Sequence, residues 1–190
     1  MSNIYEIKKE DFIYENKSLT NDLCDDIVDL YEKTSFESIY TESLNISIDS
    51  NYAKILNTLL RELNTEFRNY QKQFKNHFLI NSNKNNNNNY TLINIKTPLT
   101  PTFFLKKTTY NNETDIKIEK KIQTMQSKIK VFIFIWLLND YDGELTFWDN
   151  YKINFKKGSI IIFPVSWCFP YKEIVKLNSN KYIIFGYINF

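Results

Sequence analysis

The feature that most constrains the fold is a series of short apolar segments, separated by turns, in the C-terminal part of the chain. It begins with an almost continuous apolar run from Lys130 to Leu138, which predicts a strand buried on both faces. Turn-forming residues then follow at short intervals and separate segments rich in β-branched and aromatic residues. Many short strands at such spacing favour an all-β barrel or sandwich. The further strands predicted here are Glu144–Trp148, Tyr151–Phe155, Ser159–Phe163, Tyr171–Lys176 and Lys181–Phe190.

The N-terminal part has a different pattern. Residues Ile4–Tyr14 alternate loosely between apolar and polar, which predicts one or two short strands. A first helix is expected next, capped by Ser18, Thr20 or Asn21, because apolar residues then recur at three- and four-residue steps. A short strand at Leu44–Ile48 and a long second helix at about Asn51–Phe78 follow. Neither amphipathic helix can bury its apolar stripe alone, so both should pack on the outside of the sheet.

The segments that connect these two parts are less regular. Tyr90–Lys96 and Thr102–Tyr110 predict strands, whereas the polar segment Asn111–Lys128 has no clear periodicity. The asparagine-rich run Asn81–Asn89 predicts a loop. We therefore expect one domain over residues 1–190, with a strand and two supporting helices in 1–80, the loop in 81–89 and the β core in 90–190.

The composition excludes several kinds of site. With one histidine and two cysteines, the chain cannot form a Cys₄, Cys₂His₂ or His₃ zinc site. A two-histidine, one-carboxylate iron site is also impossible by count. The 24 basic and 22 acidic residues are interspersed, and only Arg61 and Arg68 are arginines, so nothing favours a nucleic-acid surface.

The chain ends and the cysteines bear on location and partners. The first residues form no basic start followed by an apolar run, and the longest apolar stretch is too short to cross a bilayer. Two distant cysteines favour a reducing compartment. We expect an intracellular soluble protein, or one packaged in a virion, that is not secreted and binds a protein partner rather than a membrane. Abundant Asn, Lys and Ile with one alanine are typical of AT-rich genomes, such as those of some large DNA viruses or protists.

Three segments of the C-terminal third carry a recognisable pattern. Ile135–Asp140 and Asp142–Phe147 form a Leu-Asn-Asp…Gly-Glu-Leu-Thr-Phe hairpin, Ile153–Pro164 ends in Phe-Pro, and Asn180–Tyr187 contains Lys-Tyr. This pattern resembles the 2-oxoglutarate/iron(II) dioxygenases of the prolyl 4-hydroxylase type, well over about Lys128–Phe190 and more loosely elsewhere. The resemblance implies a mainly β fold of the α+β kind, a double-stranded β-helix or jelly roll buttressed by two N-terminal helices.

The resemblance also implies where a metal site would lie. In the family, a His-x-Asp/Glu pair before the hairpin and a distal histidine beyond the Phe-Pro strand hold iron(II). At the distal position this chain has Tyr171. The His-x-Asp equivalent should fall within 111–128, where Glu113 and Asp115 form the best candidate pair, with Glu113 in place of histidine. The site is therefore expected to be degenerate, with no metal and no catalytic residue. The one histidine, His77, lies in the predicted second helix.

One ligand-binding position of the family has a counterpart in this chain. The family uses a lysine or arginine on its last strands to pair with the distal carboxylate of 2-oxoglutarate, and Lys181 lies there. Lys181 is thus a candidate residue for binding 2-oxoglutarate or another anion. A lysine that opens a final strand is also an ordinary exposed edge residue, and the sequence leaves both interpretations open.

Three functional hypotheses follow from this pattern. The first is a degenerate dioxygenase-like protein without cofactors that serves as a binding or structural module, in a large DNA virus as a component of the particle. The second is an active prolyl or protein hydroxylase that uses 2-oxoglutarate and holds Fe(II) through Glu113, Asp115 and Tyr171. The third is an unrelated jelly roll of the capsid or lectin kind, against which the long second helix argues.

Overall fold

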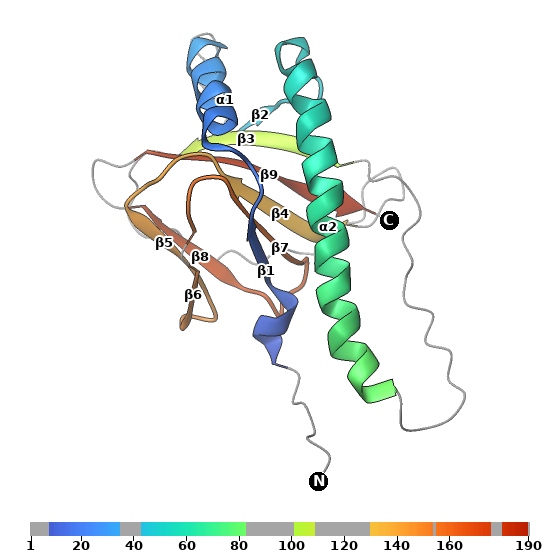
Figure 1. Ribbon diagram of the computed structural model, residues 1–190. Helices are drawn as coiled ribbons and strands as arrows, with labels where there is room; N and C mark the ends of the chain where they lie inside the picture. The colour runs from blue at the N-terminus through green and yellow to red at the C-terminus, as the bar shows by residue number, and fades with distance from the viewer. Residues whose placement is uncertain are drawn as a thin grey trace.

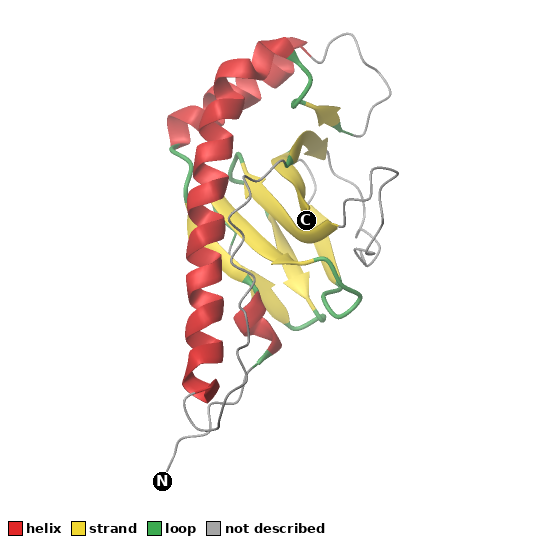
Figure 2. Cartoon of the chain, turned by 90° about the vertical axis from the view of Figure 1, so that its right-hand side faces the viewer, coloured by secondary structure: helices red, strands yellow, loops and turns green. Residues whose placement is uncertain are grey.

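Two antiparallel sheets and two helices make up the fold in a computed structural model, which describes residues 8–34, 43–82, 101–108, 130–153, 155–175 and 180–189. The sheets face each other, and the helices lie beside the larger one (Figures 1 and 2). The predicted α+β architecture, with a double-stranded β-helix supported by N-terminal helices, is confirmed.

The larger sheet has the strand order β1-β7-β4-β9-β3-β2. Its centre is formed by the apolar strand β4, which pairs with β7 on one side and β9 on the other. All pairs are antiparallel, and β1 and β2 form the two edges. The strands are β1 (Tyr14–Lys17), β2 (Leu44–Asn45), β3 (Thr102–Thr108), β4 (Lys130–Leu137), β7 (Ser159–Pro164) and β9 (Lys181–Asn189).

The smaller sheet has the order β6-β5-β8, with β5 (Gly143–Phe147) between β6 (Tyr151–Ile153) and β8 (Tyr171–Val175). In the β5–β8 register, Phe147 lies opposite Tyr171 and Leu145 lies opposite Glu173. Side chains alternate between the two faces of a strand, so Tyr171 and Glu173 lie on the same face of β8.

The larger sheet is buried on both faces, as the apolar run from 130 to 138 predicted. Phe134 and Trp136 of β4 pack in one core with residues of α1 (Asn21–Thr34) and α2 (Ala53–Ser82). The alternate residue Ile135 packs in a second core with side chains of the smaller sheet. The helices thus cover one face of the larger sheet, and the smaller sheet covers the other.

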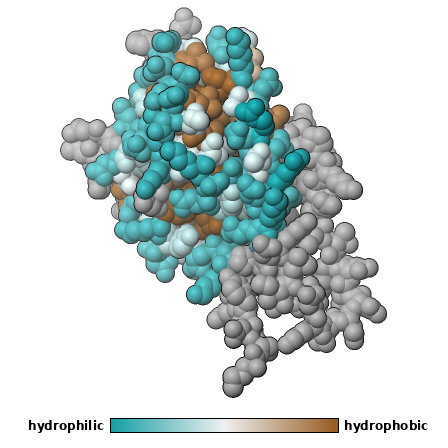
Figure 3. Space-filling view, viewed as in Figure 1, coloured by the Kyte–Doolittle hydropathy of each residue, from teal (hydrophilic) through white to brown (hydrophobic). Residues whose placement is uncertain are grey.

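Polar residues follow both helices on the molecular surface, and apolar residues are visible in the strip between them (Figure 3). This agrees with helices that turn one apolar face toward the sheet. Among the described residues, no helix combines the length and apolar composition needed to cross a membrane.

Several predicted boundaries were wrong. One or two short strands were expected in Ile4–Tyr14, but its described part contains a 3₁₀ helix at Lys9–Phe12, and β1 begins only at Tyr14. The Asp11 carboxylate accepts a hydrogen bond from the Lys8 backbone N–H at 3.0 Å, which closes that turn. The second helix continues to Ser82, so the first two residues of the expected 81–89 loop are helical. The rest of that loop, the strand predicted at 90–96 and the segment 111–128 lie outside the described residues.

Candidate functional site

The two site residues that the structure describes both lie between the sheets. Tyr171 opens β8 of the smaller sheet, and Lys181 opens β9 of the larger sheet. On β9, Lys181 shares a face with Ile183, which packs in the core between the sheets. The fold therefore brings residues from two different sheets to the interior of one sandwich. Glu113 and Asp115 lie outside the described residues.

Tyr171 is part of a packed aromatic cluster. Its side chain is 5% exposed, and its ring centroid lies 5.8 Å from that of Phe147 and 5.4 Å from that of Phe163. The Phe147 and Phe163 rings are themselves 4.9 Å apart in an edge-to-face arrangement. We call these three residues the aromatic triad. They join β5, β7 and β8 and fill the space between the sheets, in the geometry that aromatic pairs prefer.

Lys181 is fully buried and forms an ion pair across the sandwich. Its Nζ lies 3.0 Å from Oε1 of Glu173, and the side chains of the two residues are 0% and 4% exposed. The interpretation of Lys181 as an exposed edge residue was therefore wrong. Because β9 belongs to the larger sheet and β8 to the smaller one, the pair connects the two sheets through the interior.

A tyrosine ring lies beside this ion pair. The Nζ of Lys181 is 5.1 Å from the ring centroid of Tyr141, within the range of a cation–π interaction. Burial raises the pKa of Tyr141, and the charges of Glu173 and Glu144 raise it further. The buried Tyr141 hydroxyl has no hydrogen-bond partner among the described residues. Gly143 allows the ring to lie close, because a Cβ at that position would collide with Tyr141 and with the Ile174 carbonyl.

The start of β9 is held by a residue of the Leu-Asn-Asp motif for which the sequence predicted no role. Asn139 donates a hydrogen bond from Nδ2 to the carbonyl of Asn180 at 2.7 Å, and its Oδ1 accepts one from the Tyr182 N–H at 2.8 Å. These bonds clamp the backbone on both sides of Lys181. Glu173 was also missed, although its position two residues after Tyr171 in a predicted strand was a signal that both face the interior.

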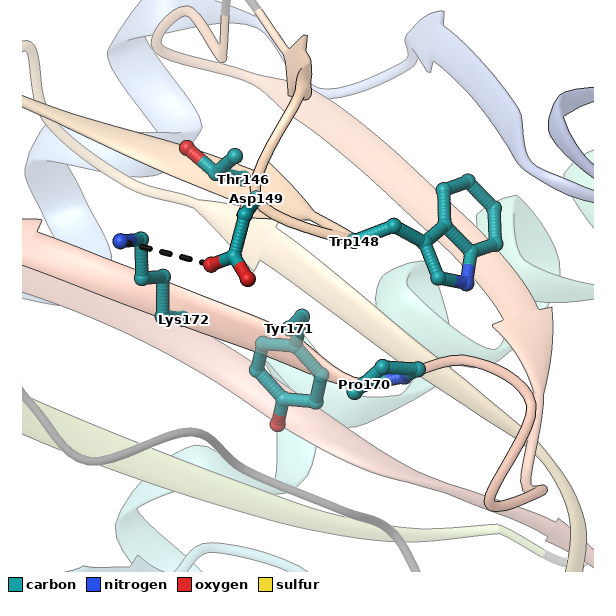
Figure 4. Close-up of a pocket in the computed structure, with 6 residues that line it drawn as sticks. All are labelled: Thr146, Trp148, Asp149, Pro170, Tyr171 and Lys172. Atoms are coloured by element: carbon teal, nitrogen blue, oxygen red, sulfur yellow. Dashed lines mark ion pairs between the residues drawn. The ribbon is translucent and has the colours of Figure 1, made fainter.

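A small hollow lies where β5 ends and β8 begins (Figure 4). Its volume is about 30 Å³, which is room for only a few water molecules. On one side of the hollow the Nζ of Lys172 lies 3.5 Å from Oδ1 of Asp149, and the Trp148 ring points away from that pair. The hollow is too small for an organic ligand. Its lining residues are Thr146, Trp148, Asp149, Pro170, Tyr171 and Lys172.

Other residues singled out in the sequence lie elsewhere. His77 belongs to α2, outside both sheets. Within the described ranges, no three His, Cys, Asp or Glu residues are grouped so that they could hold a metal ion. This does not test the predicted Glu113–Asp115–Tyr171 set, because only Tyr171 belongs to the described residues.

Comparisons with solved structures support the fold. The chain is similar to the viral collagen prolyl hydroxylase from Paramecium Bursaria Chlorella virus-1, solved as a 2OG complex, with a TM-score of 0.58, 13% identity, and coverage of 94% of this chain and 96% of that one. It is also similar to a prolyl hydroxylase from Trichoplax adhaerens, with a TM-score of 0.58, 12% identity, and coverage of 94% and 83%.

A Pseudomonas putida prolyl-4-hydroxylase gives a TM-score of 0.53 at 8% identity, covering 93% of this chain and 84% of that one. No protein-family model and no curated protein sequence matches the chain. At such low identity, these similarities establish the prolyl 4-hydroxylase fold. The function has to be argued from the residues of the site.

Proposed function

We propose that this protein is a non-catalytic relative of the prolyl 4-hydroxylases, which has lost the iron site and serves as a protein-binding or structural module. The observation that carries the proposal is the packing of Tyr171 in the aromatic triad. A metal ligand has to present its donor atom at a position open to the metal and to substrate. Tyr171, at the position of the distal histidine, instead contributes its ring to the core of the sandwich.

Lys181 supports the same proposal. In the family, the matching residue pairs with a carboxylate of 2-oxoglutarate, but here its ammonium group already lies against the carboxylate of Glu173. The described interior therefore fits neither an iron ligand at Tyr171 nor an incoming cosubstrate carboxylate at Lys181. Instead, the Tyr171 ring fills the core of the sandwich, and the protein's own Glu173 carboxylate balances the charge of Lys181.

The setting that we propose is the particle of a large DNA virus. The composition, rich in Asn, Lys and Ile with a single alanine, is typical of AT-rich genomes. A viral prolyl hydroxylase shares the fold, which agrees with a viral setting. A non-catalytic β-sandwich would act there by binding another protein.

Titration of the purified protein with iron(II) and 2-oxoglutarate tests the loss of catalysis. We expect no succinate above the protein-free blank and no metal-dependent rise in the melting temperature. An active prolyl hydroxylase assayed in parallel serves as the positive control. Succinate formation, even without a protein substrate, would overturn the proposal and favour the hydroxylase with atypical ligands.

The alternative makes its own prediction about Tyr171. If the Tyr171 oxygen is an iron ligand, Tyr171→Phe abolishes succinate formation, whereas Tyr151→Phe, a matched change at a partly buried tyrosine of the same sheet, leaves it intact. Introducing histidine at both candidate positions, with Glu113→His and Tyr171→His, tests the assignment of the positions. Recruitment of iron by this double variant would support that assignment.

A further inference from the structure

The ion pair inside the sandwich has a consequence for ligand binding. We propose that Glu173 is an internal counter-ion that occupies the anion position at Lys181, so that the interior is a carboxylate site already filled by the protein's own side chain. This inference rests on the proposed function. It explains why 2-oxoglutarate would no longer bind: the Glu173 carboxylate takes the place of the cosubstrate carboxylate at Lys181. It also predicts a latent site for a small carboxylate.

The burial of Lys181 requires a neighbouring anion. An ammonium group that is removed from water loses its hydration, and this loss is offset only by an opposite charge and hydrogen bonds. Glu173 supplies that charge at 3.0 Å and is itself buried. The electrostatic attraction is strong in such an interior, and the loss of one partner of a buried ion pair is strongly destabilising.

The lysine is held independently of the glutamate. Asn139 clamps the backbone on both sides of Lys181, and the antiparallel β3–β9 pairing extends to Lys181 itself, opposite Thr108. The Tyr141 ring lies against its ammonium group. Shortening Glu173 should therefore leave the ammonium group in place and facing an open space.

The group removed by Glu173→Ala indicates which ligand would fit the space beside Lys181. Glu173→Ala removes Cγ, Cδ and both carboxylate oxygens, which are the heavy atoms of acetate. A small monocarboxylate thus matches the removed group in size and charge. Chloride has the charge without the shape or the two acceptor oxygens that a carboxylate offers to an ammonium group.

The test compares the melting temperatures of the full-length protein and its variants in sodium acetate and in sodium chloride at equal ionic strength. We expect Glu173→Ala to lower the melting temperature by about 10 °C in chloride, as the loss of a buried ion-pair partner does in a domain of this size. Acetate at ten times its Kd should restore about 3 °C of this loss. The wild-type protein should melt at the same temperature in both salts.

Two further variants make the test specific. Glu173→Ala/Lys181→Met should show no response to acetate, because the positive charge is gone. Glu144→Ala is the matched control, since it removes a partly exposed carboxylate that pairs with Lys152, and acetate should not affect it. An equal melting temperature of Glu173→Ala in both salts, or tight binding of 2-oxoglutarate by the wild-type protein, would overturn the proposal.

If Glu173→Ala does not fold in chloride, refolding from urea in acetate and in chloride gives the same information. Native fluorescence recovered only in acetate supports the inference, and failure in both salts overturns it. The outcome is distinct from the test of the proposed function. Succinate formation by the wild-type protein refutes the loss of catalysis, whereas a missing acetate response refutes only the role of Glu173.

Discussion

Removal of the Tyr171 ring should strongly destabilise the protein if this residue belongs to the core. A buried aromatic side chain removes about 150–250 Å² from water, and at about 25 cal/mol per Å² this is worth roughly 4–6 kcal/mol as an upper bound. The ring contacts with Phe147 and Phe163 add about 0.5–1.5 kcal/mol each. Because Ala retains part of the burial and the site can partly collapse, we expect Tyr171→Ala to cost about 3–5 kcal/mol.

Equilibrium unfolding in urea, followed by tryptophan fluorescence, measures this cost. With a denaturant dependence of about 2 kcal/mol per molar urea, the midpoint should fall by about 2 M with little change in slope. Trp167→Ala is the control, because Trp167 lies in the loop between β7 and β8 and is 79% exposed. That change should alter the free energy of unfolding by less than about 0.5 kcal/mol.

The same measurement can refute the reasoning. A loss below about 1 kcal/mol for Tyr171→Ala would show that the ring is not packed in the sandwich, and the main support for a non-catalytic function would be gone. If Tyr171→Ala unfolds already in buffer, Tyr171→Leu keeps part of the apolar volume and should give a smaller, measurable loss.

Three other predictions concern residues that hold the scaffold. Asn139→Ala removes both hydrogen bonds of the β9 clamp and should lower the free energy of unfolding by about 1–3 kcal/mol in urea. Gly158 has φ +80° and lies against the Leu19 carbonyl, so Gly158→Ala should cost at least about 1 kcal/mol in the same assay. Tyr14 has its pKa raised to about 12 by burial and by the hydrogen bond and charge of Glu66. Its unfolded form therefore ionises first, so stability should fall from about pH 10 to pH 12, and Tyr14→Phe should flatten that part of a pH series of urea unfolding.

The sequence predicted most of the strands because their signals are local. Alternation and turn residues identified β5, β7, β8 and β9 within one or two residues, and the run from 130 to 138 indicated a strand buried on both faces. One error occurs where a short-range interaction competes with the pattern, because the hydrogen bond between Lys8 and Asp11 closes a 3₁₀ turn within the predicted first strand. The other concerns a helix end: α2 continues past its predicted end at Phe78 to Ser82.

The ion pair could not be predicted from local patterns. Glu173 lies in one sheet and Lys181 in the other, and their contact depends on how the sheets face each other. In the sequence, a glutamate within a strand and a lysine at a strand end both indicate solvent exposure. Only the alternation that places Glu173 on the same face as Tyr171 suggested that it points inward.

The motif residues behind the family resemblance perform structural tasks in this chain. Asn139 clamps the start of β9, and the neighbouring Asp140 accepts a hydrogen bond from the Lys157 backbone N–H at 3.1 Å, which ties two turns together. Gly143 and Gly158 lie where a Cβ would collide with neighbouring backbone. Residues with such tasks are retained as long as the sandwich must fold, independently of catalysis. A hairpin motif of this kind therefore indicates the fold, and the chemistry has to be judged from what the side chains at positions 171 and 181 contact.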